Sequence, residues 1–429
     1  MGYHLSKVSD ELSAENNRLK HEISQLKNKI SEQIENKIQI THIDGKPSDI
    51  LTTENCTLKS KLDEQNALIN MYKMKHQSCN AVKVQCTHGK INGILETLDE
   101  KSCSDIKVSK ENYDYEYLVF SGGSIKGVSF IGNILQLEEY EMIRDPSNGK
   151  LYIKGFAGVS VGSIYASLLA IGYTGKEIEK IVMDLDMDDL FNDDLGYAHM
   201  IYNFIEKYGT CPGDYMLKTL GKLIKDKTGN EDYTIENLYK EKGIKLAIVA
   251  TNDNQQCSVY FNPEHEVEKY RNIPIRKAIR ASSAMPFIFQ PYQYGGDFFS
   301  DGGILNNYPI NIFDSVKIGD PLAELNLLPP NPKVLGFFII TADENINYTP
   351  VKRTNITSLY QYSTLFVDML MDQNIKRSMT PSFFVRTIFN SVPVYSMTQM
   401  DLTQDQKRHL VDVGKQSTVE FFENKMESQ

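Results

Sequence analysis

The sequence predicts an α/β protein in which helices cover both faces of a mostly parallel central sheet, preceded by an N-terminal coiled coil. Leucine recurs at every seventh residue near the N-terminus, and short apolar runs alternate with helical patterns from residue 115 onward. Strands that alternate with helices are typical of parallel sheets with helices on both faces. We therefore expect a coiled-coil region over residues 1–74, a linker over residues 75–112, and an α/β domain with a C-terminal helical extension over residues 113–429.

The first 30 residues carry a heptad repeat. Leucine at the d positions with isoleucine at a favours two parallel strands, and an asparagine at a fixes their register. Glutamates at g would face lysines at e of a partner helix. The sequence therefore predicts a parallel homodimer, and the alternative is a single amphipathic helix packed on the domain. The d positions are Leu5, Leu12, Leu19 and Leu26; the a positions are Ser9, Asn16, Ile23 and Ile30; Glu15 and Glu22 lie at g, and Lys20 and Lys27 lie at e.

Charge and hydropathy restrict the class of partner. The chain has a formal net charge of −10, and the acidic surplus lies after residue 110. Because phosphate binding requires clustered Lys and Arg, we expect no nucleic-acid partner. The first 30 residues have no apolar core typical of a signal peptide, and no run approaches the ~18–20 apolar residues of a membrane span. We expect a cytoplasmic protein that contacts membranes or micelles only peripherally.

The cysteine pattern indicates a reducing compartment and no metal site. The six cysteines are few and scattered for a chain of 429 residues, so we interpret them as free thiols. His76, Cys79, Cys86 and His88 lie close together, but their spacing contains no CxxC pair of the kind that binds zinc. We expect no metal or organic cofactor.

The predicted elements of the α/β domain indicate where an active site forms. In open parallel sheets, active sites lie outside the carboxyl ends of the strands. A glycine-rich or serine-containing motif directly follows two of the predicted strands. The expected strands are residues 117–120, 152–159, 245–250 and 334–340, and the expected helices are residues 128–140 and 162–171.

The first motif is the GxSxG sequence Gly158-Val159-Ser160-Val161-Gly162 between a predicted strand and a predicted helix. A serine on such a sharp turn projects its hydroxyl away from the sheet, and Gly158 and Gly162 let the turn close. The positive end of the following helix favours negative charge that develops near the serine. We interpret Ser160 as a nucleophile.

The second motif is the glycine turn Ser121-Gly122-Gly123-Ser124-Ile125-Lys126-Gly127, which again follows a strand. Consecutive glycines leave backbone N–H groups free to face an anion, as an oxyanion hole requires. The alternative is a phosphate-binding turn, but the sequence has neither GxGxxG spacing nor a Walker GK[ST]. The third motif is Asp301-Gly302-Gly303, in which a carboxylate held in a glycine turn can act as general base for a serine hydroxyl.

Taken in this order, the three motifs resemble the patatin-like phospholipase family. The segments Arg280-Ala281-Ser282-Ser283-Ala284-Met285-Pro286 and Thr234-Ile235-Glu236-Asn237-Leu238-Tyr239 are also similar to that family. The resemblance implies a three-layer α/β/α fold, Ser160 as nucleophile, and Asp301 activating it without histidine. It further implies an oxyanion hole around Gly122, Gly123 and Ser124, with Lys126 and Gly127 in the same loop. Ser124 departs from the family, which usually has a third glycine there; a positive φ at Ser124 would add strain.

The resemblance implies a phospholipase A-type lipid acyl hydrolase that cleaves fatty acyl esters of phospholipids or glycerolipids. Two alternatives stay open. His409 follows Asp301 in chain order, as in the Ser–acid–His triad of an α/β-hydrolase esterase. The other alternative is a non-catalytic lipid-binding scaffold dimerised by the coiled coil.

Overall fold

The computed structural model describes residues 108–110, 112–185, 196–341, 356–378, 381–393 and 402–427. The predicted coiled-coil region and nearly all of the predicted linker lie outside these residues. The parallel dimer and the domain boundaries therefore stay predictions. Within the described ranges, no helix is both long enough and apolar enough to cross a membrane.

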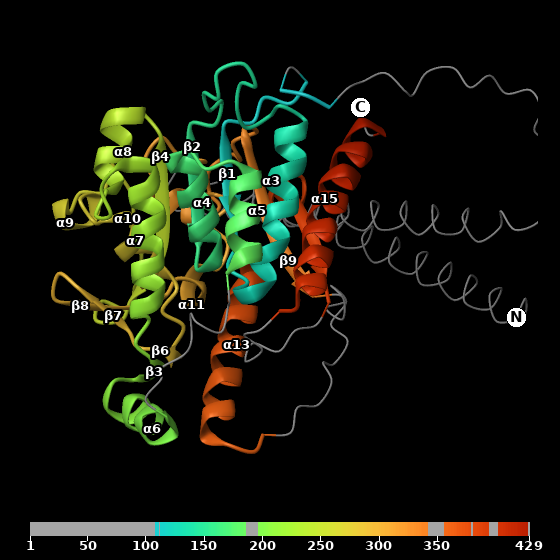
Figure 1. Ribbon diagram of the computed structural model, residues 1–429. Coiled ribbons are helices and arrows are strands. Elements are labelled where there is room, and N and C mark those ends of the chain that lie inside the picture. Colours follow the sequence, from blue (N-terminus) through green and yellow to red (C-terminus); the bar gives the residue numbers. More distant parts are fainter. Residues whose placement is uncertain are drawn as a thin grey trace, which may run out of the picture. The chain divides into compact units, whose positions relative to one another are not determined.

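The core of the fold is an eight-stranded sheet in the order β10-β9-β1-β2-β4-β8-β7, with β5 also paired to β4 (Figure 1). From β10 to β4 all neighbours are parallel, which confirms the predicted mostly parallel sheet. The antiparallel strands β5, β7 and β8 at the other edge were not predicted. The strands are β1 (Tyr117–Phe120), β2 (Gly155–Val159), β4 (Lys245–Asn252), β5 (Cys257–Phe261), β7 (Tyr292–Tyr294), β8 (Asp297–Asp301), β9 (Val334–Thr341) and β10 (Thr387–Val392), and a separate two-stranded sheet pairs β3 (Gly209–Cys211) with β6 (Phe287–Phe289).

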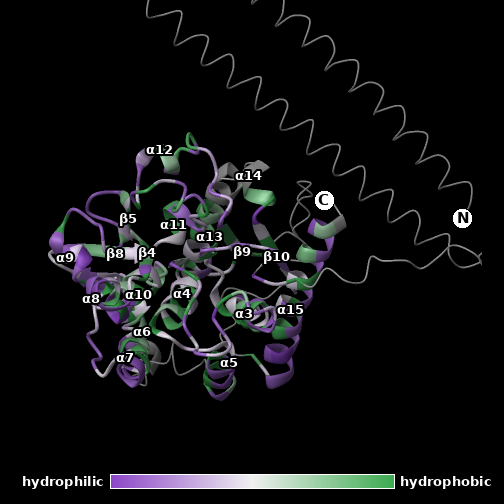
Figure 2. Ribbon diagram, turned by 90° about the horizontal axis from the view of Figure 1, so that it is seen from above, coloured by the Kyte–Doolittle hydropathy of each residue, from purple (hydrophilic) through white to green (hydrophobic). Residues whose placement is uncertain are grey.

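Both faces of the central sheet are buried. Side chains alternate between the two faces along each strand, so a single strand contributes to the apolar cluster on each side. On β1, Leu118 and Phe120 join one apolar cluster and Val119 joins the other. Figure 2 shows α3, α5 and α7 on one side of the strands and α12 and α14 on the other. The first side has α3 (Ser129–Glu139), α4 (Val161–Ile171), α5 (Gly175–Asp184), α7 (Asp214–Thr228), α8 (Ile235–Lys242), α10 (Ile275–Ser282) and α15 (Gln404–Glu427). The second has residues 307–318 with α11 (Gly303–Asn306), α12 (Pro321–Glu324) and α14 (Pro381–Phe384).

The register of the strands brings the three motifs to one edge of the sheet. Phe120, the last residue of β1, pairs with Gly158 near the end of β2. Asp301, the last residue of β8, pairs with Ala250 on β4, which is itself the neighbour of β2. The loops that follow β1, β2 and β8 therefore meet beside the carboxyl ends of the parallel strands.

The C-terminal helix α15 packs against α3, the helix that follows the glycine turn. A Cβ at Gly132 on α3 would overlap Val411 O, and a Cβ at Gly414 on α15 would overlap Ser129 O. The two helix backbones are therefore in direct contact. The buried Asn133 side chain on α3 donates to Gly414 O at 2.9 Å. Because α3 starts where the glycine turn ends, α15 fixes the base of that turn.

Candidate active site

Ser160 occupies the sharp turn between β2 and α4. Its φ is 52°, a conformation that costs a non-glycine residue free energy and turns the side chain out of the strand. A Cβ at Gly158 would overlap Gly162 O, and a Cβ at Gly162 would overlap Ser121 O. The two glycines of the GxSxG motif therefore let the turn close on itself and let the glycine turn pass beside it.

The buried hydroxyl of Ser282, at the end of α10, links the turn at Ser160 to β4. Ser282 Oγ accepts a hydrogen bond from Ser160 N–H at 2.8 Å and donates to Val249 O at 2.5 Å. Its backbone carbonyl accepts from Gly302 N–H at 3.2 Å. Ser282 thus joins the turn at Ser160 to the turn at Asp301. We assigned no role to Ser282 from sequence, although it lies in the family-like segment that ends at residue 286.

Asp301 lies fully buried beside Ser160. Burial raises the pKa of Asp301 to about 6, while the Ser160 hydroxyl and the Gly303 N–H each act to lower it. Gly303 N–H donates to Asp301 Oδ1 at 2.8 Å. No hydrogen bond reaches Oδ2 from the described residues. Asp301 therefore offers an open acceptor next to the serine hydroxyl, and at neutral pH it is largely ionised while still able to take a proton.

The glycine turn approaches Ser160 closely. A Cβ at Gly122 would lie 3.5 Å from Ser160 Cβ. Gly122 N–H donates to Asn307 O at 3.0 Å, so this amide holds the turn in place and is already engaged. Gly123 has an extended φ of 171°, whereas Ser124 has a φ of 52°. Ser124 thus adopts the positive φ for which the sequence analysis expected strain.

The remaining motif residues pack around these turns. Lys126 is half-buried, and its N–H donates to Gly123 O at 3.2 Å. A Cβ at Gly127 would lie 2.6 Å from Val161 Cγ2, so Gly127 makes room for the valine that follows Ser160. On the aspartate turn, a Cβ at Gly302 would overlap Val249 O, and one at Gly303 would lie 2.6 Å from Asn307 Oδ1.

His409 does not take part in this arrangement. It is exposed on α15, whereas Asp301 is buried and its pKa is set by burial, Ser160 and Gly303. Among the residues that the structure describes, no group of three His, Cys, Asp or Glu side chains is placed to hold a metal ion. His76, Cys79, Cys86 and His88, where the sequence predicted no zinc site, lie outside those residues. A serine beside an open carboxylate and a glycine turn is suited to acyl transfer.

Comparison with known proteins identifies related chains. Residues 118–314 match the model of the patatin-like phospholipase family. The chain is 32% identical over 299 residues to an uncharacterized protein of Acanthamoeba polyphaga mimivirus, across 69% of this chain and 90% of that protein. It is 29% identical over 203 residues to a probable lipid hydrolase of Invertebrate iridescent virus 6, across 46% of this chain and 63% of the relative. Among solved structures, VipD from Legionella pneumophila aligns with a TM-score of 0.45 and 18% identity, covering 72% of this chain and 67% of VipD. The matched range 118–314 contains all three motifs.

Proposed function

Because the chain belongs to the patatin-like phospholipase family, we propose that it hydrolyses fatty acyl esters of phospholipids or related glycerolipids through a Ser160–Asp301 dyad. The observation that carries this proposal is the pairing of a serine at a positive φ with a fully buried carboxyl whose Oδ2 accepts no hydrogen bond from the described residues. Such a carboxylate can serve directly as the general base of the serine.

In the proposed reaction, Asp301 takes the proton of the Ser160 hydroxyl as its oxygen attacks the acyl carbonyl carbon. The backbone N–H groups of Gly123 and Ser124 stabilise the resulting oxyanion. The tetrahedral intermediate collapses, the C–O bond to the glycerol oxygen breaks, and the proton on Asp301 passes to that leaving oxygen. Water then attacks the acyl-enzyme, again with Asp301 as base, and releases a fatty acid and free Ser160.

The helix α13 (Leu359–Ser378) favours a lipid surface as the source of substrate. Val367 and Met371 on its inner side are buried, yet Tyr362 and Phe366 on the outer side are exposed. A helix that is apolar on both sides requires a further apolar cover. Met371 Cε also lies against Gly303, so this helix borders the proposed site.

The charge of this surface indicates which lipids it fits. Residues 359–367 contain no Lys, Arg, Asp or Glu, in a chain with a net charge of −10. Exposed tyrosines suit the boundary between apolar and polar regions of a bilayer. We propose that α13 contacts neutral or zwitterionic lipid, which makes the membrane association peripheral. The helix α6 (Gly196–Glu206), with Ile201 and Ile205 exposed, adds apolar surface near the two-stranded sheet.

The first test measures fatty acid released from phosphatidylcholine vesicles by mass spectrometry, with wild type beside Ser160→Ala. Release by wild type alone supports the lipid hydrolase. Turnover of only soluble short-chain esters would favour the esterase alternative. No turnover, together with no labelling of Ser160 by a fluorophosphonate, would favour the scaffold alternative.

The second test separates lipid contact from chemistry. The substitution Phe366→Glu should lower sedimentation with vesicles and turnover of vesicle lipid, and leave hydrolysis of a soluble short-chain ester unchanged. Val316→Glu is the matched control, because Val316 is 91% exposed and lies on residues 307–318, away from α13 in the chain. Equal vesicle binding by wild type and the Phe366 variant would contradict the proposed lipid contact.

We further propose that residues 1–74 join two chains as a parallel coiled coil. This proposal rests on the heptad repeat alone. Light scattering of the full chain and of a chain that lacks residues 1–110 would measure the change in mass. A monomeric full-length protein would contradict this assembly.

A further inference from the structure

Asn307 lies directly after α11 and contacts both turns that flank the nucleophile. The residue is buried, with 7% of its surface exposed. Its backbone carbonyl accepts the Gly122 N–H at 3.0 Å. Its side-chain Oδ1 is buried and accepts no hydrogen bond from the described residues. A buried amide oxygen without a donor is costly, so its surroundings require an explanation.

The amide of Asn307 lies beside two glycines, Gly122 and Gly303, that border Ser160 and Asp301. Asn307 Oδ1 would overlap a Cβ at Gly122, and that Cβ position is 3.5 Å from Ser160 Cβ. Asn307 Oδ1 is also 2.6 Å from the Cβ position of Gly303, which is 3.1 Å from Asp301 Oδ1. The Asn307 amide therefore lies close to both the Asp301 carboxyl and the Ser160 side chain.

An amide oxygen that faces a carboxylate gains nothing, whereas an amide N–H in the same place gains a charge-assisted hydrogen bond. The oxygen and nitrogen of asparagine exchange places when the terminal amide turns by half a revolution, and the surrounding hydrogen bonds decide between the two. We propose that Asn307 is a positioning residue whose side-chain N–H donates to the Asp301 carboxylate, while its backbone carbonyl holds the glycine turn. The inference rests on the proposed function, since it assigns a third residue to the Ser160–Asp301 pair.

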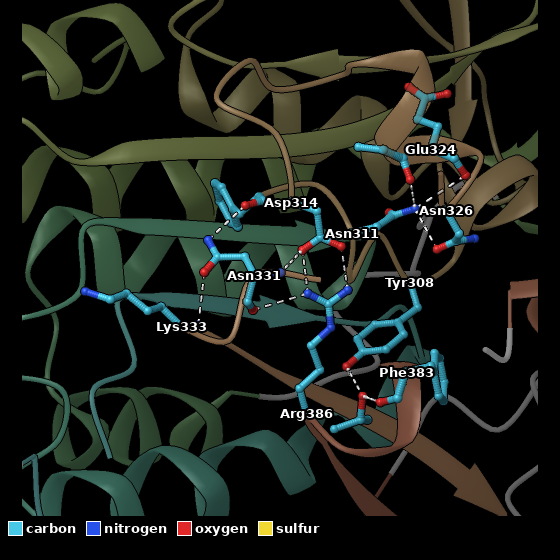
Figure 3. A network of polar contacts seen from close by, with 12 residues as sticks. Tyr308, Asn311, Asp314, Glu324, Asn326, Asn331, Lys333, Phe383 and Arg386 are labelled. Atoms are coloured by element: carbon cyan, nitrogen blue, oxygen red, sulfur yellow. Dashed lines mark hydrogen bonds and ion pairs between the residues drawn. The ribbon is translucent and has the colours of Figure 1, made fainter. Parts of the chain in front are cut away.

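The segment after Asn307 is fixed strongly enough to hold this amide in place. Tyr308 OH is hydrogen-bonded to Thr387 Oγ1 at 2.9 Å on β10. Arg386 Nη2 donates to Asp314 Oδ2 at 2.6 Å in a buried ion pair. Asn311 Nδ2 donates to Ala323 O at 2.6 Å. Figure 3 shows contacts that join residues 308–331 to Arg386, the residue directly before β10. Asn307 is therefore held at the start of an anchored segment.

Few other groups influence the Asp301 carboxyl. The Ser160 hydroxyl on the elbow and the Gly303 N–H on its own turn act on its pKa, and burial opposes them. Charged residues on the adjoining elements include Lys126 on the glycine turn, Arg280 on α10 and Asp253 after β4, and none of them is among the causes of the shift in the pKa of Asp301. Arg280 donates to Pro212 O and Gln290 O, and Asp253 Oδ2 accepts from Ser300 Oγ at 2.8 Å. A change in the pKa of Asp301 after substitution of Asn307 would therefore report on the amide itself.

The experiment measures the pH dependence of fluorophosphonate labelling of Ser160 in the full chain, since labelling requires an ionised Asp301 but no identified lipid. Wild-type labelling should rise with pH around the Asp301 pKa of about 6. Asn307→Ala removes the N–H donor and should move this rise upward by about one to two pH units, the range for a hydrogen bond to a charged group. Asn307→Asp keeps the shape, places a second carboxyl beside Asp301, and should also move the rise upward.

The adjacent Asn306 provides the matched control. Asn306 Nδ2 donates to Tyr260 OH at 3.1 Å, away from the dyad, so Asn306→Asp should keep the wild-type midpoint. If the pH midpoint of labelling is unchanged or lower in Asn307→Ala, the inference is overturned. Loss of an amide oxygen that faces the carboxylate would leave the midpoint unchanged or lower it. If Asn307→Ala fails to fold, an unmoved midpoint in Asn307→Asp overturns it equally. A wild type that is not labelled at any pH refutes the proposed function instead.

Discussion

Replacing Asp301 with asparagine should abolish turnover and, above pH 6, stabilise the protein. The pKa of Asp301 rises from 3.8 in the unfolded chain to about 6 when the residue is buried. Between pH 3.8 and about pH 6, Asp301 loses its proton in the unfolded chain but keeps it in the folded protein. The folded state then binds more protons, so its stability falls as pH rises from about 4 to about 6 and stays lowered above that. The neutral side chain of the Asp301→Asn variant carries no such cost.

The size of the effect follows from the two pKa values. A pKa difference of about 2 at 1.36 kcal/mol each corresponds to about 3 kcal/mol, an order-of-magnitude figure. At about 2 °C for each kcal/mol in a domain of this size, the Tm of Asp301→Asn relative to wild type should increase by about 6 °C between pH 4 and pH 7.

Thermal unfolding of both proteins across this pH range, followed by circular dichroism, measures the difference. The substitution Asp226→Asn on the exposed face of α7 controls for the loss of one negative charge. Parallel curves of Tm against pH for wild type and Asp301→Asn would refute the reasoning, because they would show that burial does not disfavour the Asp301 carboxylate.

Three further substitutions test the packing of the site. Ser124→Gly removes a side chain held at a φ of 52° and should raise the stability by about 1 kcal/mol with labelling retained; a lower Tm would contradict the strain. Gly414→Ala would overlap a backbone oxygen of α3 and should cost about 1–3 kcal/mol, whereas Gly221→Ala in α7 meets only the side chains of Arg276 and Glu231, at 3.3 Å or more, and should not lower the Tm. Ser282→Ala leaves the Ser160 N–H without its acceptor and should slow labelling about tenfold or more, whereas Ser283→Ala removes a hydroxyl with no partner among the described residues and should label like wild type.

The parallel half of the fold was predictable because its strands are buried on both faces. Residues 117–120 and 334–340 are nearly continuous apolar runs, and β1 and β9 match them closely. The antiparallel half was missed for physical reasons. Strand β8 begins and ends with an aspartate, and β5 has only three consecutive buried residues after the exposed Cys257, so each gives a shorter apolar run than β1 or β9.

The site was predictable only as far as local motifs define it. The GxSxG and Asp-Gly-Gly sequences each mark a turn by their glycines, and the pairing of Ser160 with Asp301 follows from their resemblance to the patatin-like phospholipase family. Ser282 and Asn307 act through contacts with residues far away in the chain: Ser282 is 122 residues from Ser160. Neither residue carries a local pattern that sets it apart from an ordinary serine or asparagine, so its role becomes visible only once the sheet brings the loops together.

The site concentrates features that oppose folding, and those at Ser160 and Asp301 serve the proposed chemistry. Ser160 and Ser124 both hold positive φ values, and Asp301 is buried without a counter-charge among the described residues. Positive φ values at non-glycine residues persist where the surrounding structure fixes them, at about 1–3 kcal/mol each. Here the surrounding structure is the direct backbone contact at the motif glycines. Relaxing the Ser160 turn would withdraw the hydroxyl from Asp301, and exposing Asp301 would return its pKa toward 3.8, which makes it a weaker base. Substitutions that relieve the cost at Ser160 or Asp301 should therefore stabilise the protein and lower its activity together, whereas Ser124 lies in the turn rather than in the dyad and can be relaxed without this loss.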